Sequence, residues 1–379
     1  MADQETTIST GANGERPAVT IVIVVYNRRD ELREVLRRML HESEYPAGCL
    51  DIVVVDNAST DGSAAMVRDE FAEVHLIARD TNIGAPAWND GFAVARGDYV
   101  LILDDDCYLL PGDLERAVDA AREYEADLVT FKVISTKDPD YVFTEKYRTG
   151  LFTFWGCAWL VRRTVLNELG GYDPELFMWA NELEFTIRFL DRGHRHLHFP
   201  EVVAQHMKPP PADEAEFDLP GYKINARHWP YIAAKLFRTR DALEALVALL
   251  VTVVRDGLRK DMPALRAIPD TFAGFLHGLR HRSPVRPEIS RFYRRNFENF
   301  ASPWRLARPP AELVRALPRE LVVGVVRGEK RPEGVGRREQ FYAERNELYT
   351  LDEAMTLEFK PPGDGAPAVP VLRPAGRAG

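Results

Sequence analysis

The sequence predicts an α/β protein with a mainly parallel sheet covered by helices on both faces, followed by a mostly helical C-terminal extension. From Val19 onward, short apolar runs alternate with stretches of helical period. The runs are apolar on both faces, which is typical of strands in a covered parallel sheet. Beyond about Pro230 the pattern changes to helical periodicity with basic clusters.

The predicted elements follow one another along the chain. The run VTIVIVV predicts a strand, and the next stretch, RRDELREVLRRMLH, carries its apolar residues on one helical face. LDIVVVD, VHLIARD and YVLILDDD predict further strands, with helices expected in SAAMVRDEFA and APAWNDGFAVA between them. The chain then predicts a helix over Leu114–Glu123, a helix from about Asn181, and a strand leading to His206.

Composition excludes several classes of protein. The 379-residue chain is 45% hydrophobic, which is ample for a packed core. Its formal net charge of -9 argues against a nucleic-acid partner, because such affinity comes largely from Lys and Arg. The 3 cysteines are too few and too scattered for a disulfide framework or a zinc site, so we expect a reducing, cytoplasmic location.

We expect four regions along the chain. Residues 1–16 are polar and predict a disordered lead-in, and residues 17–230 predict the α/β domain. Residues 231–358 predict a helical region, and residues 359–379 predict a Pro/Gly-rich tail. The most apolar run, ALVALLVTVV, is well short of the ~20 residues that cross a bilayer, so we expect no transmembrane segment.

Three interpretations compete for the region Asp241–Arg295, where this apolar run is followed by the basic cluster RHRSPVRPEISRFYRR. A helix packed on the protein with its arginines in solvent is favoured, because charge runs usually face water. Docking at a membrane surface ranks second, because the run lacks the polar face of an interfacial helix. A subunit contact is the third interpretation, so a homo-oligomer stays open.

Polar residues stand where three predicted strands end. These are Tyr26, Asp56 and the triplet Asp104–Asp106, and ligands of parallel sheets bind beyond such carboxyl ends. Side chains alternate along a strand, so Asp104 and Asp106 share a side while Asp105 points elsewhere. Oxygen ligands of this kind suit Mg²⁺ or Mn²⁺, although an acidic loop that caps the next helix is the simpler alternative.

Other residues near these strand ends are suited to a nucleotide ligand. Asp56 can accept hydrogen bonds from a base or a ribose, and the ring of Tyr26 can stack on a base. Asn82, Gly84 and Asn89 lie just upstream of the triplet, where a glycine permits close backbone approach to a ligand.

With these stretches in order, the sequence resembles the family-two, GT-A fold glycosyltransferases, which are inverting enzymes that use nucleotide-sugar donors. The resemblance rests on IVIVVYNRRDELREVL, DIVVVDNASTDGS, NIGAPAWNDGFAVARGDYVLILDDD, LGGYDPELFMWANELEFTIRFLDRG and VVAQH, between Val19 and His206. It implies donor binding by Tyr26, Asp56, Asn82, Asn89, Asp104 and Asp105. It also implies a divalent metal (Mg²⁺ or Mn²⁺) on the Asp-x-Asp pair Asp104 and Asp106, with His206 completing the metal shell or touching the diphosphate.

The resemblance also implies a general base in the segment ANELEF. Similar enzymes carry an acidic pair there, whereas this chain has Asn181 followed by Glu182, so the role falls on Glu182. Glu184 and Arg188, four residues apart on the expected helix, form either an exposed ion pair or a support for the site. Trp155 and Trp179 are candidates for acceptor binding, whereas burial in the core is expected for Trp159.

The expected activity is therefore a metal-assisted, inverting, hexosyltransferase-type transfer from a nucleotide-diphosphate sugar to an acceptor hydroxyl. The acceptor would be a glycan, a lipid-linked molecule or a small molecule. Two alternatives stay open: a sugar nucleotidyltransferase, and a non-catalytic nucleotide-sugar-binding interaction protein on the same scaffold. The expected location is cytoplasmic, with peripheral membrane attachment as the variant that the second interpretation of Asp241–Arg295 implies.

Overall fold

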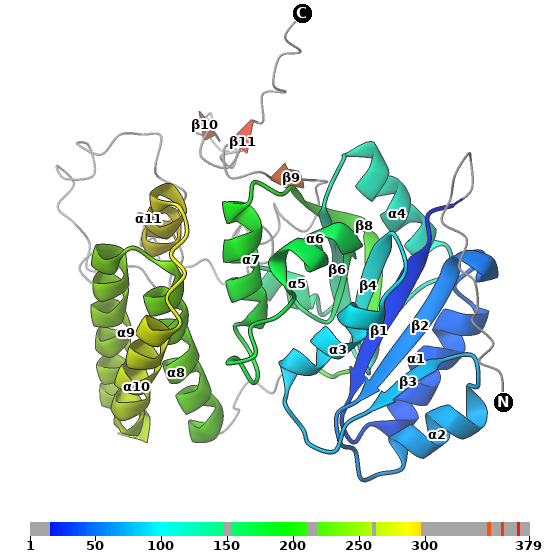
Figure 1. Cartoon of the computed structure of the whole chain (residues 1–379), viewed down its shortest axis with the longest axis horizontal. Helices are drawn as coiled ribbons and strands as arrows, with labels where there is room; N and C mark the ends of the chain where they lie inside the picture. Colours follow the sequence, from blue (N-terminus) through cyan, green and yellow to red (C-terminus); the bar gives the residue numbers. More distant parts are fainter. Residues whose placement is uncertain are drawn as a thin grey trace, which may run out of the picture. The chain divides into compact units, whose positions relative to one another are not determined.

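The computed structural model of the chain contains two compact units, and each unit is described by itself (Figure 1). The structure describes residues 16–146, 153–210, 218–259 and 263–296, and three short strands nearer the C-terminus. The first unit comprises Met1–Phe189, His194–Phe217 and Glu339–Leu348. The second unit comprises Leu190–Gly193, Asp218–Arg338 and Tyr349–Gly379. Residues 1–15 of the predicted lead-in and nearly all of the predicted tail lie outside the described residues.

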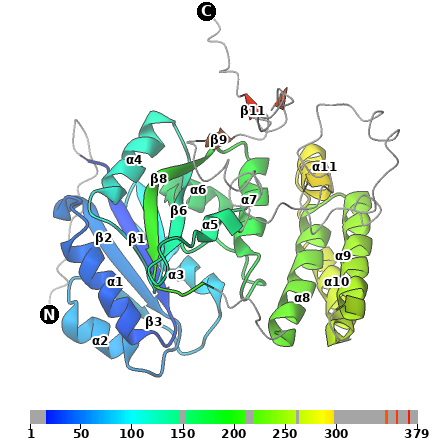
Figure 2. The ribbon, with the colours of Figure 1, turned by 180° about the vertical axis from the view of Figure 1, so that it is seen from behind.

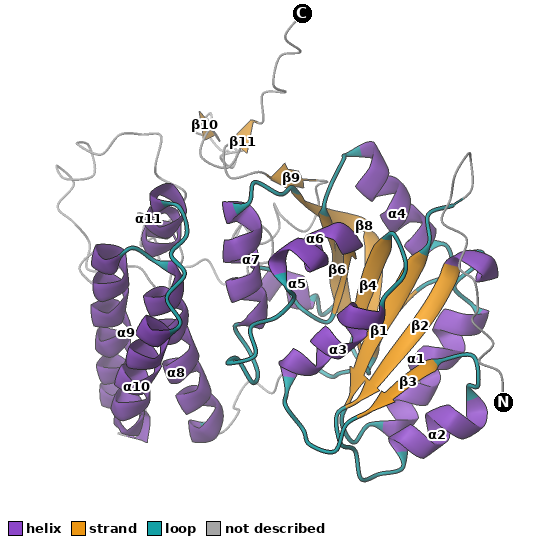
Figure 3. Cartoon of the chain, viewed as in Figure 1, coloured by secondary structure: helices purple, strands orange, loops and turns teal. Residues whose placement is uncertain are grey.

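The first unit is built on one mixed sheet with the strand order β3-β2-β1-β4-β7-β6-β8-β5 (Figure 3). β1 is parallel to β2 and β4, β2 to β3, and β6 to β8. β7 is antiparallel to β4 and β6, β5 is antiparallel to β8, and β9 also pairs with β8. The strands are β1 (Val19–Val25), β2 (Leu50–Asp56), β3 (His75–Ala78), β4 (Tyr99–Asp104), β5 (Cys107–Leu109), β6 (Leu128–Ser135), β7 (Ala158–Arg162), β8 (His196–His206) and β9 (Glu347–Tyr349).

Helices cover both faces of this sheet, as predicted (Figures 1 and 2). Apolar residues of α1, α2 and α4 form one core cluster with alternate residues of β1, whereas α3 and α7 pack on the other face. The helices are α1 (Arg29–His41), α2 (Ser63–Glu70), α3 (Trp88–Val94), α4 (Asp113–Glu123), α5 (Phe143–Lys146), α6 (Arg163–Leu169) and α7 (Asn181–Asp191), with 3-10 turns η1 (Ala47–Cys49) and η2 (Ala85–Ala87).

Strand β1 accounts for the two-sided apolar signal in the sequence. Ile21 and Ile23 face the helices α1 and α2, whereas Val22 packs against Gly91 of α3 on the opposite face. The one polar residue of β1, Thr20, is fully buried, and its hydroxyl accepts hydrogen bonds from the backbone N–H groups of Arg96 and Gly97. Burial on both faces therefore explains why the strand has no polar side.

The sheet contains four strands that the sequence patterns did not predict, namely β5, β6, β7 and β9. β5 is only three residues long and follows the aspartate triplet directly, and β6 interrupts its apolar run with Thr130 and Lys132. Both pair with β8, which is distant in the sequence, so their local signals are weak. The predicted α/β sheet covered by helices is confirmed, and the sheet is mixed: β7 is an antiparallel strand between β4 and β6, and β5 is antiparallel to β8.

The second unit is helical in the residues described. It contains α8 (Leu219–Leu236), α9 (Thr239–Arg259), the turn η3 (Pro263–Ala267), α10 (Ile268–Arg280) and α11 (Pro287–Asn296), and the strand pair β10 (Glu358–Phe359) and β11 (Pro370–Val371). α8 and α10 pack very closely, because a Cβ on Gly274 or Gly278 would overlap backbone oxygens of α8. The predicted boundary between residues 230 and 231 lies inside α8.

None of the described helices is long and apolar enough to span a membrane.

Candidate active site

The aspartate triplet stands at the end of β4, on the edge of the sheet where β8 also ends. Asp104 is the last residue of β4, and Asp105 and Asp106 form the turn into β5. Ligand atoms of Asp104, Asp106 and His206 all lie within 4.8 Å of one another. The structure therefore brings together the three residues predicted as metal ligands.

Charge in this cluster is unevenly balanced. Burial and the neighbouring Asp106 carboxylate raise the pKa of Asp104 to about 6. Burial also tends to raise the pKa of Asp106, but hydrogen bonds and ion pairs with His206 and Arg28 lower it below the usual value. Asp106 Oδ1 lies 3.1 Å from His206 Nε2, and His206 Nδ1 is buried without a hydrogen-bond partner among the described residues. Two carboxylates and an imidazole, with an excess of negative charge, fit a divalent cation.

Arg28 is a further member of the cluster that the sequence patterns did not reveal. Its guanidinium forms an ion pair with Asp106 and lies 3.6 Å from Asp105. Asp105 also accepts a hydrogen bond from the backbone N–H of Tyr26 at 3.4 Å, and burial raises its pKa well above the usual value. Arg28 precedes α1 and looks like an ordinary surface arginine in the sequence, because its partners are about 78 residues away.

Asp56 and Tyr26 lie at the neighbouring strand ends of β2 and β1. Asp56 is buried, and its Oδ1 has no hydrogen-bond partner among the described residues, while Oδ2 accepts from the N–H of Ser59 at 3.3 Å. The Tyr26 side chain is 47% exposed. An orphaned buried carboxylate oxygen beside an exposed aromatic ring suits a ligand that offers N–H or hydroxyl donors and a flat face.

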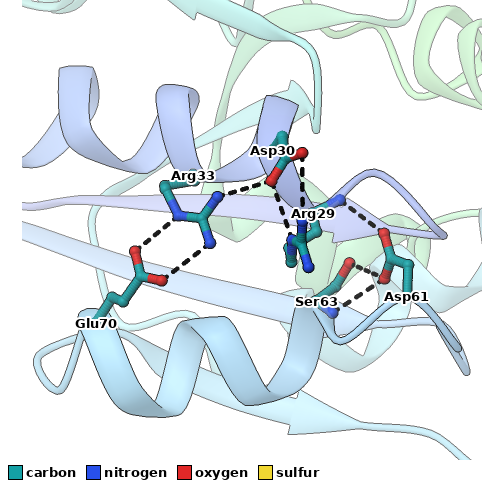
Figure 4. A network of polar contacts seen from close by, with 6 residues as sticks. All are labelled: Arg29, Asp30, Arg33, Asp61, Ser63 and Glu70. Atoms are coloured by element: carbon teal, nitrogen blue, oxygen red, sulfur yellow. Dashed lines mark hydrogen bonds and ion pairs between the residues drawn. The ribbon is translucent and has the colours of Figure 1, made fainter.

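A polar network holds the segments that carry these two residues (Figure 4). Asp61 accepts hydrogen bonds from the N–H of Arg29, at the start of α1, and from the N–H and hydroxyl of Ser63, at the start of α2. Arg33 joins the same helices through two hydrogen bonds to Glu70, of 2.7 and 2.9 Å. The arginine–carboxylate pairs of the network are exposed, so their effect is to fix geometry more than to add stability.

Asn82 and Gly84 make contacts with other residues of the protein. Asn82 Oδ1 accepts hydrogen bonds from the side chain of Asn57 at 2.9 Å and from the N–H of Gly84 at 2.8 Å. A Cβ on Gly84 would overlap the carbonyl oxygen of Phe177. The sequence suggested that this glycine permits close approach of a ligand, but in the structure it permits close approach of the loop that contains Phe177. The contact fixes the loop that precedes α7.

Asn89 has a structural role in place of the predicted donor contact. Its side-chain amide donates to the carbonyl of Tyr172 and accepts from the N–H of Tyr172, each at 2.8 Å. This paired contact anchors the turn after α6 to α3. The sequence could not distinguish the two roles, because Tyr172 lies 83 residues further on.

Glu182 lies beside the metal cluster through a short chain of contacts. Its carboxylate covers the bare Cα of Gly156, where a Cβ would overlap Oε1. The next residue, Cys157, accepts a hydrogen bond through its carbonyl from the N–H of Asp104 at 2.8 Å. Gly156 and Cys157 therefore connect the candidate base to the end of β4.

The environment of Glu182 suits proton transfer near neutral pH. Burial raises its pKa to about 7, and the nearby negative charge of Asp104 adds to this effect. A carboxylate with such a pKa can accept a proton from a hydroxyl group under ordinary conditions.

Asn181, where similar enzymes carry an acid, holds the loop before α7. It is buried, and its amide donates a 2.7 Å hydrogen bond to the carbonyl of Leu176. An ionised carboxylate has no proton to donate there. The loop between them is unusual, because Trp179 and Ala180 both have φ near +60°.

Glu184 and Arg188 form the predicted ion pair, but the pair is not on the surface. Glu184 is fully buried, and Arg188 contacts both of its oxygens at 2.7 to 2.9 Å. Arg188 also donates to the carbonyls of Leu169 and Gly171, each at 2.6 Å. The pair therefore fastens α7 to the turn that Asn89 holds from the other side.

The three tryptophans differ in burial. Trp159 is fully buried and packs against Phe185. Trp155 is partly buried and stacks on Phe143, whose ring also contacts His206, whereas Trp179 is exposed three residues before Glu182. Trp179 thus faces solvent, whereas Trp155 lies one ring contact away from His206.

Comparison with known proteins defines the class of this fold and site. Residues 20–170 match the family model described as "Glycosyl transferase family 2". The structure is similar to that of residues 1–349 of TarS from S. aureus, solved in complex with UDP-GlcNAc, with a TM-score of 0.51 and 17% sequence identity over 72% of this chain and 82% of that one. The first unit is thus a GT-A fold.

The predicted resemblance is confirmed for these residues, since residues 20–170 match the glycosyl transferase family 2 model. Glu182 and His206 lie outside the matched residues.

Two curated relatives are similar over parts of their length. The probable glycosyltransferase YdaM of Bacillus subtilis (strain 168) is 26% identical over 52% of this chain and 52% of its own length. The poly(ribitol-phosphate) beta-glucosyltransferase of Bacillus spizizenii is 31% identical over 30% of this chain and 19% of its own length. The chain thus spans about half of one relative and a fifth of the other.

We predict that Arg188→Met destabilises the first unit by about 3 kcal/mol or more, because it leaves the Glu184 charge buried without its partner. Urea unfolding monitored by tryptophan fluorescence measures the loss. The double variant Glu184→Leu/Arg188→Met should recover part of it, because both charges are then gone. A loss below about 1 kcal/mol in the single variant would contradict the assigned role of the pair.

Proposed function

We propose that this protein is an inverting glycosyltransferase that transfers a sugar from a nucleotide-diphosphate sugar to an acceptor hydroxyl. The observation that carries the proposal is the cluster of Asp104, Asp106 and His206, with Glu182 connected to it through Gly156 and Cys157. The family match over residues 20–170 supports the same class of reaction. The glucosyltransferase named among the relatives supports transfer of a hexose.

The donor would bind across the carboxyl ends of β1, β2 and β4. Tyr26 would stack on the base, and the orphaned Oδ1 of Asp56 would accept from the base or the ribose. The side-chain N–H₂ of Asn82 would donate a hydrogen bond to the nucleotide sugar, while its Oδ1 accepts hydrogen bonds from Asn57 and Gly84. We withdraw Asn89 from the donor site because its amide is engaged by Tyr172.

The diphosphate would lie against the triplet. A divalent cation, Mg²⁺ or Mn²⁺, held by Asp104, Asp106 and His206 would neutralise charge that develops on the leaving diphosphate. Arg28, already paired with Asp106, would supply a second positive charge at the same edge. Asp105 would hold the backbone of Tyr26 in position.

In the transfer step, the acceptor oxygen would attack the anomeric carbon on the side opposite the diphosphate. The new bond joins the acceptor oxygen to that carbon, and the bond to the diphosphate oxygen breaks, so the nucleotide diphosphate leaves with the electron pair. The acceptor proton would pass to the carboxylate of Glu182. One displacement of this kind inverts the configuration of the sugar.

The acceptor would approach past the loop before α7. Phe177, Met178 and Trp179 are all exposed on that loop, close in sequence to Glu182, and offer an apolar and aromatic surface to a sugar or lipid-linked acceptor. The location would be reducing and cytoplasmic, because Cys49, Cys107 and Cys157 are free thiols and the Cys107 thiol donates a 3.6 Å hydrogen bond to the Cys157 sulfur.

Asp106→Ala should abolish metal-dependent donor binding and turnover, because no neutral side chain replaces a hard oxygen anion on Mg²⁺ or Mn²⁺. The measurement is the rise in unfolding temperature when Mn²⁺ and each member of a nucleotide-sugar panel are added. Asp69→Ala, an exposed position on α2, is the control and should keep the full rise. Turnover that persists unchanged in excess chelator would refute the metal site.

Glu182→Gln should reduce transfer by ~100-fold or more while donor affinity stays nearly constant, which is the usual effect of losing a general base. In the wild type, kcat/KM should rise with pH through about 7, because the base acts only when it is deprotonated. The variant should lack this rise. The control is Glu175→Gln, an exposed acid on the preceding loop. Near-normal transfer by Glu182→Gln would remove Glu182 from the mechanism.

Gly156→Ala should also reduce transfer by ~100-fold, because its Cβ would displace the Glu182 carboxylate by about 1 Å or more. Gly48→Ala, where a Cβ would meet no heavy atom within 4 Å, is the matched control. Adding Glu182→Asp to Gly156→Ala should restore part of the activity, because the shorter side chain draws the carboxylate back. Unimpaired transfer by Gly156→Ala would mean that Glu182 acts from another position.

A further inference from the structure

Helix α9 of the second unit exposes an apolar stripe. Its members recur every three or four residues, so they lie along one side of the helix, and their exposed fractions range from 38% to 75%. They are Leu243, Val247, Val251, Val254 and Leu258. The opposite side of α9, including Ala245, Leu249 and Val253, is buried in the second unit. α9 is therefore apolar on both its packed side and its open side.

A second apolar stripe lies on α10. Phe272, Leu276 and Leu279 are 46%, 58% and 40% exposed and are again spaced by four and three residues. The two helices run in opposite directions as neighbours, because Arg282, just after α10, donates to the carbonyl of Phe237 and to the hydroxyl of Thr239 at the start of α9. We call the eight side chains of both stripes the α9–α10 apolar face.

This face gathers most of the exposed large apolar side chains in the described part of the chain. The other five are Tyr26, Leu110, Phe177, Met178 and Trp179. Four of those five lie at or beside the proposed active site. Exposed apolar stripes on two neighbouring helices are the kind of surface that marks an interaction site.

The segment that carries the face is strongly basic within an acidic protein. Residues 218–296 contain 15 Lys and Arg against 7 Asp and Glu, an excess of 8 positive charges in a chain with a net charge of -9. Arg240, one turn before Leu243, has an 83% exposed side chain and is paired with Glu244 at 3.1 Å, and Arg280 is exposed beside Leu279. Positive charge therefore borders the end of the face where α9 begins and α10 ends.

We propose that the α9–α10 apolar face docks on the surface of an anionic membrane, with α9 and α10 lying in the plane of the headgroups. Apolar burial and attraction of arginines to anionic lipid reinforce one another at such a surface. A second copy of the chain would cover the apolar residues, but two such basic surfaces would repel each other. A nucleic acid would use the positive charge and leave the apolar face uncovered.

This inference reverses the order of the interpretations that the sequence favoured. From the sequence, packing on the protein was favoured over membrane docking for residues 245–254, because this run lacks a polar face. In the structure one side of the run is packed, whereas the other side is exposed and also apolar. The basic cluster after α10 contributes less than its composition suggests. Arg294, for example, is largely buried in ion pairs with Glu244 and Asp241.

Sedimentation of the full-length protein with vesicles tests the docking, and it needs no transferase activity. We expect binding to vesicles of phosphatidylcholine and phosphatidylglycerol, weaker binding to phosphatidylcholine alone, and incomplete release at high salt because the apolar part is not screened. Val247→Ser/Leu276→Ser should lower the partition coefficient by ~10-fold or more. Leu110→Ser, an exposed apolar position in the first unit, is the control and should bind as the wild type does.

A labelled variant makes the orientation testable. Val251→Cys in a Cys49→Ser background, carrying an environment-sensitive fluorophore, should brighten and shift to the blue on anionic vesicles, whereas the same label at Asp69→Cys should not. Wild-type protein that stays in the supernatant with every vesicle would overturn the proposal. So would a dimer that Val247→Ser/Leu276→Ser dissociates, in place of a change in vesicle binding, because a second copy would then cover the face.

Discussion

Mutual repulsion among three carboxylates at the end of β4 is the constraint around which the candidate site is built. Asp104, Asp105 and Asp106 are adjacent, and burial of a strand end prevents water from screening them fully. Three long-range contacts partly offset this repulsion: His206 at the end of β8, Arg28 before α1, and the backbone N–H of Tyr26. The pKa of Asp104 is still raised to about 6, so negative charge remains in excess. A cation-assisted chemistry is the natural use of that excess.

The same strand end also fixes the candidate base. Cys157 is hydrogen-bonded to Asp104, and Gly156 beside it leaves the space that the Glu182 carboxylate occupies. Around this contact, Asn181 closes the loop before α7, Arg188 fastens α7 to the turn at Gly171, and Asn89 holds the next residue of that turn. The proposed metal ligands and the proposed base are therefore held by one set of contacts, which is the arrangement that preorganised catalysis requires.

Local patterns in the sequence predicted what depends on neighbouring residues. The strands that end in Tyr26, Asp56 and Asp104 and the helix that begins at Asn181 follow from runs and periodicities a few residues long. β5, β6 and β7 depend on pairing with strands far away in the sequence, so the local patterns missed them. The roles of Arg28, Gly156 and Asn89 rest on contacts across 26 to 83 residues, which no local pattern encodes. In α9 the buried side and the exposed side are both apolar, so the sequence pattern could not show which side is buried.

The most direct test of the account is pulsed electron paramagnetic resonance on Mn²⁺ bound to the protein with a nucleotide-diphosphate sugar. Coordination by His206 next to the diphosphate predicts a nitrogen coupling from one imidazole together with phosphorus couplings from the donor. The nitrogen coupling should vanish in His206→Ala and remain in Asp69→Ala. Phosphorus couplings without any imidazole signal in the wild type, or no protein-bound Mn²⁺ with any donor, would contradict the assignment of Asp104, Asp106 and His206 as the metal site.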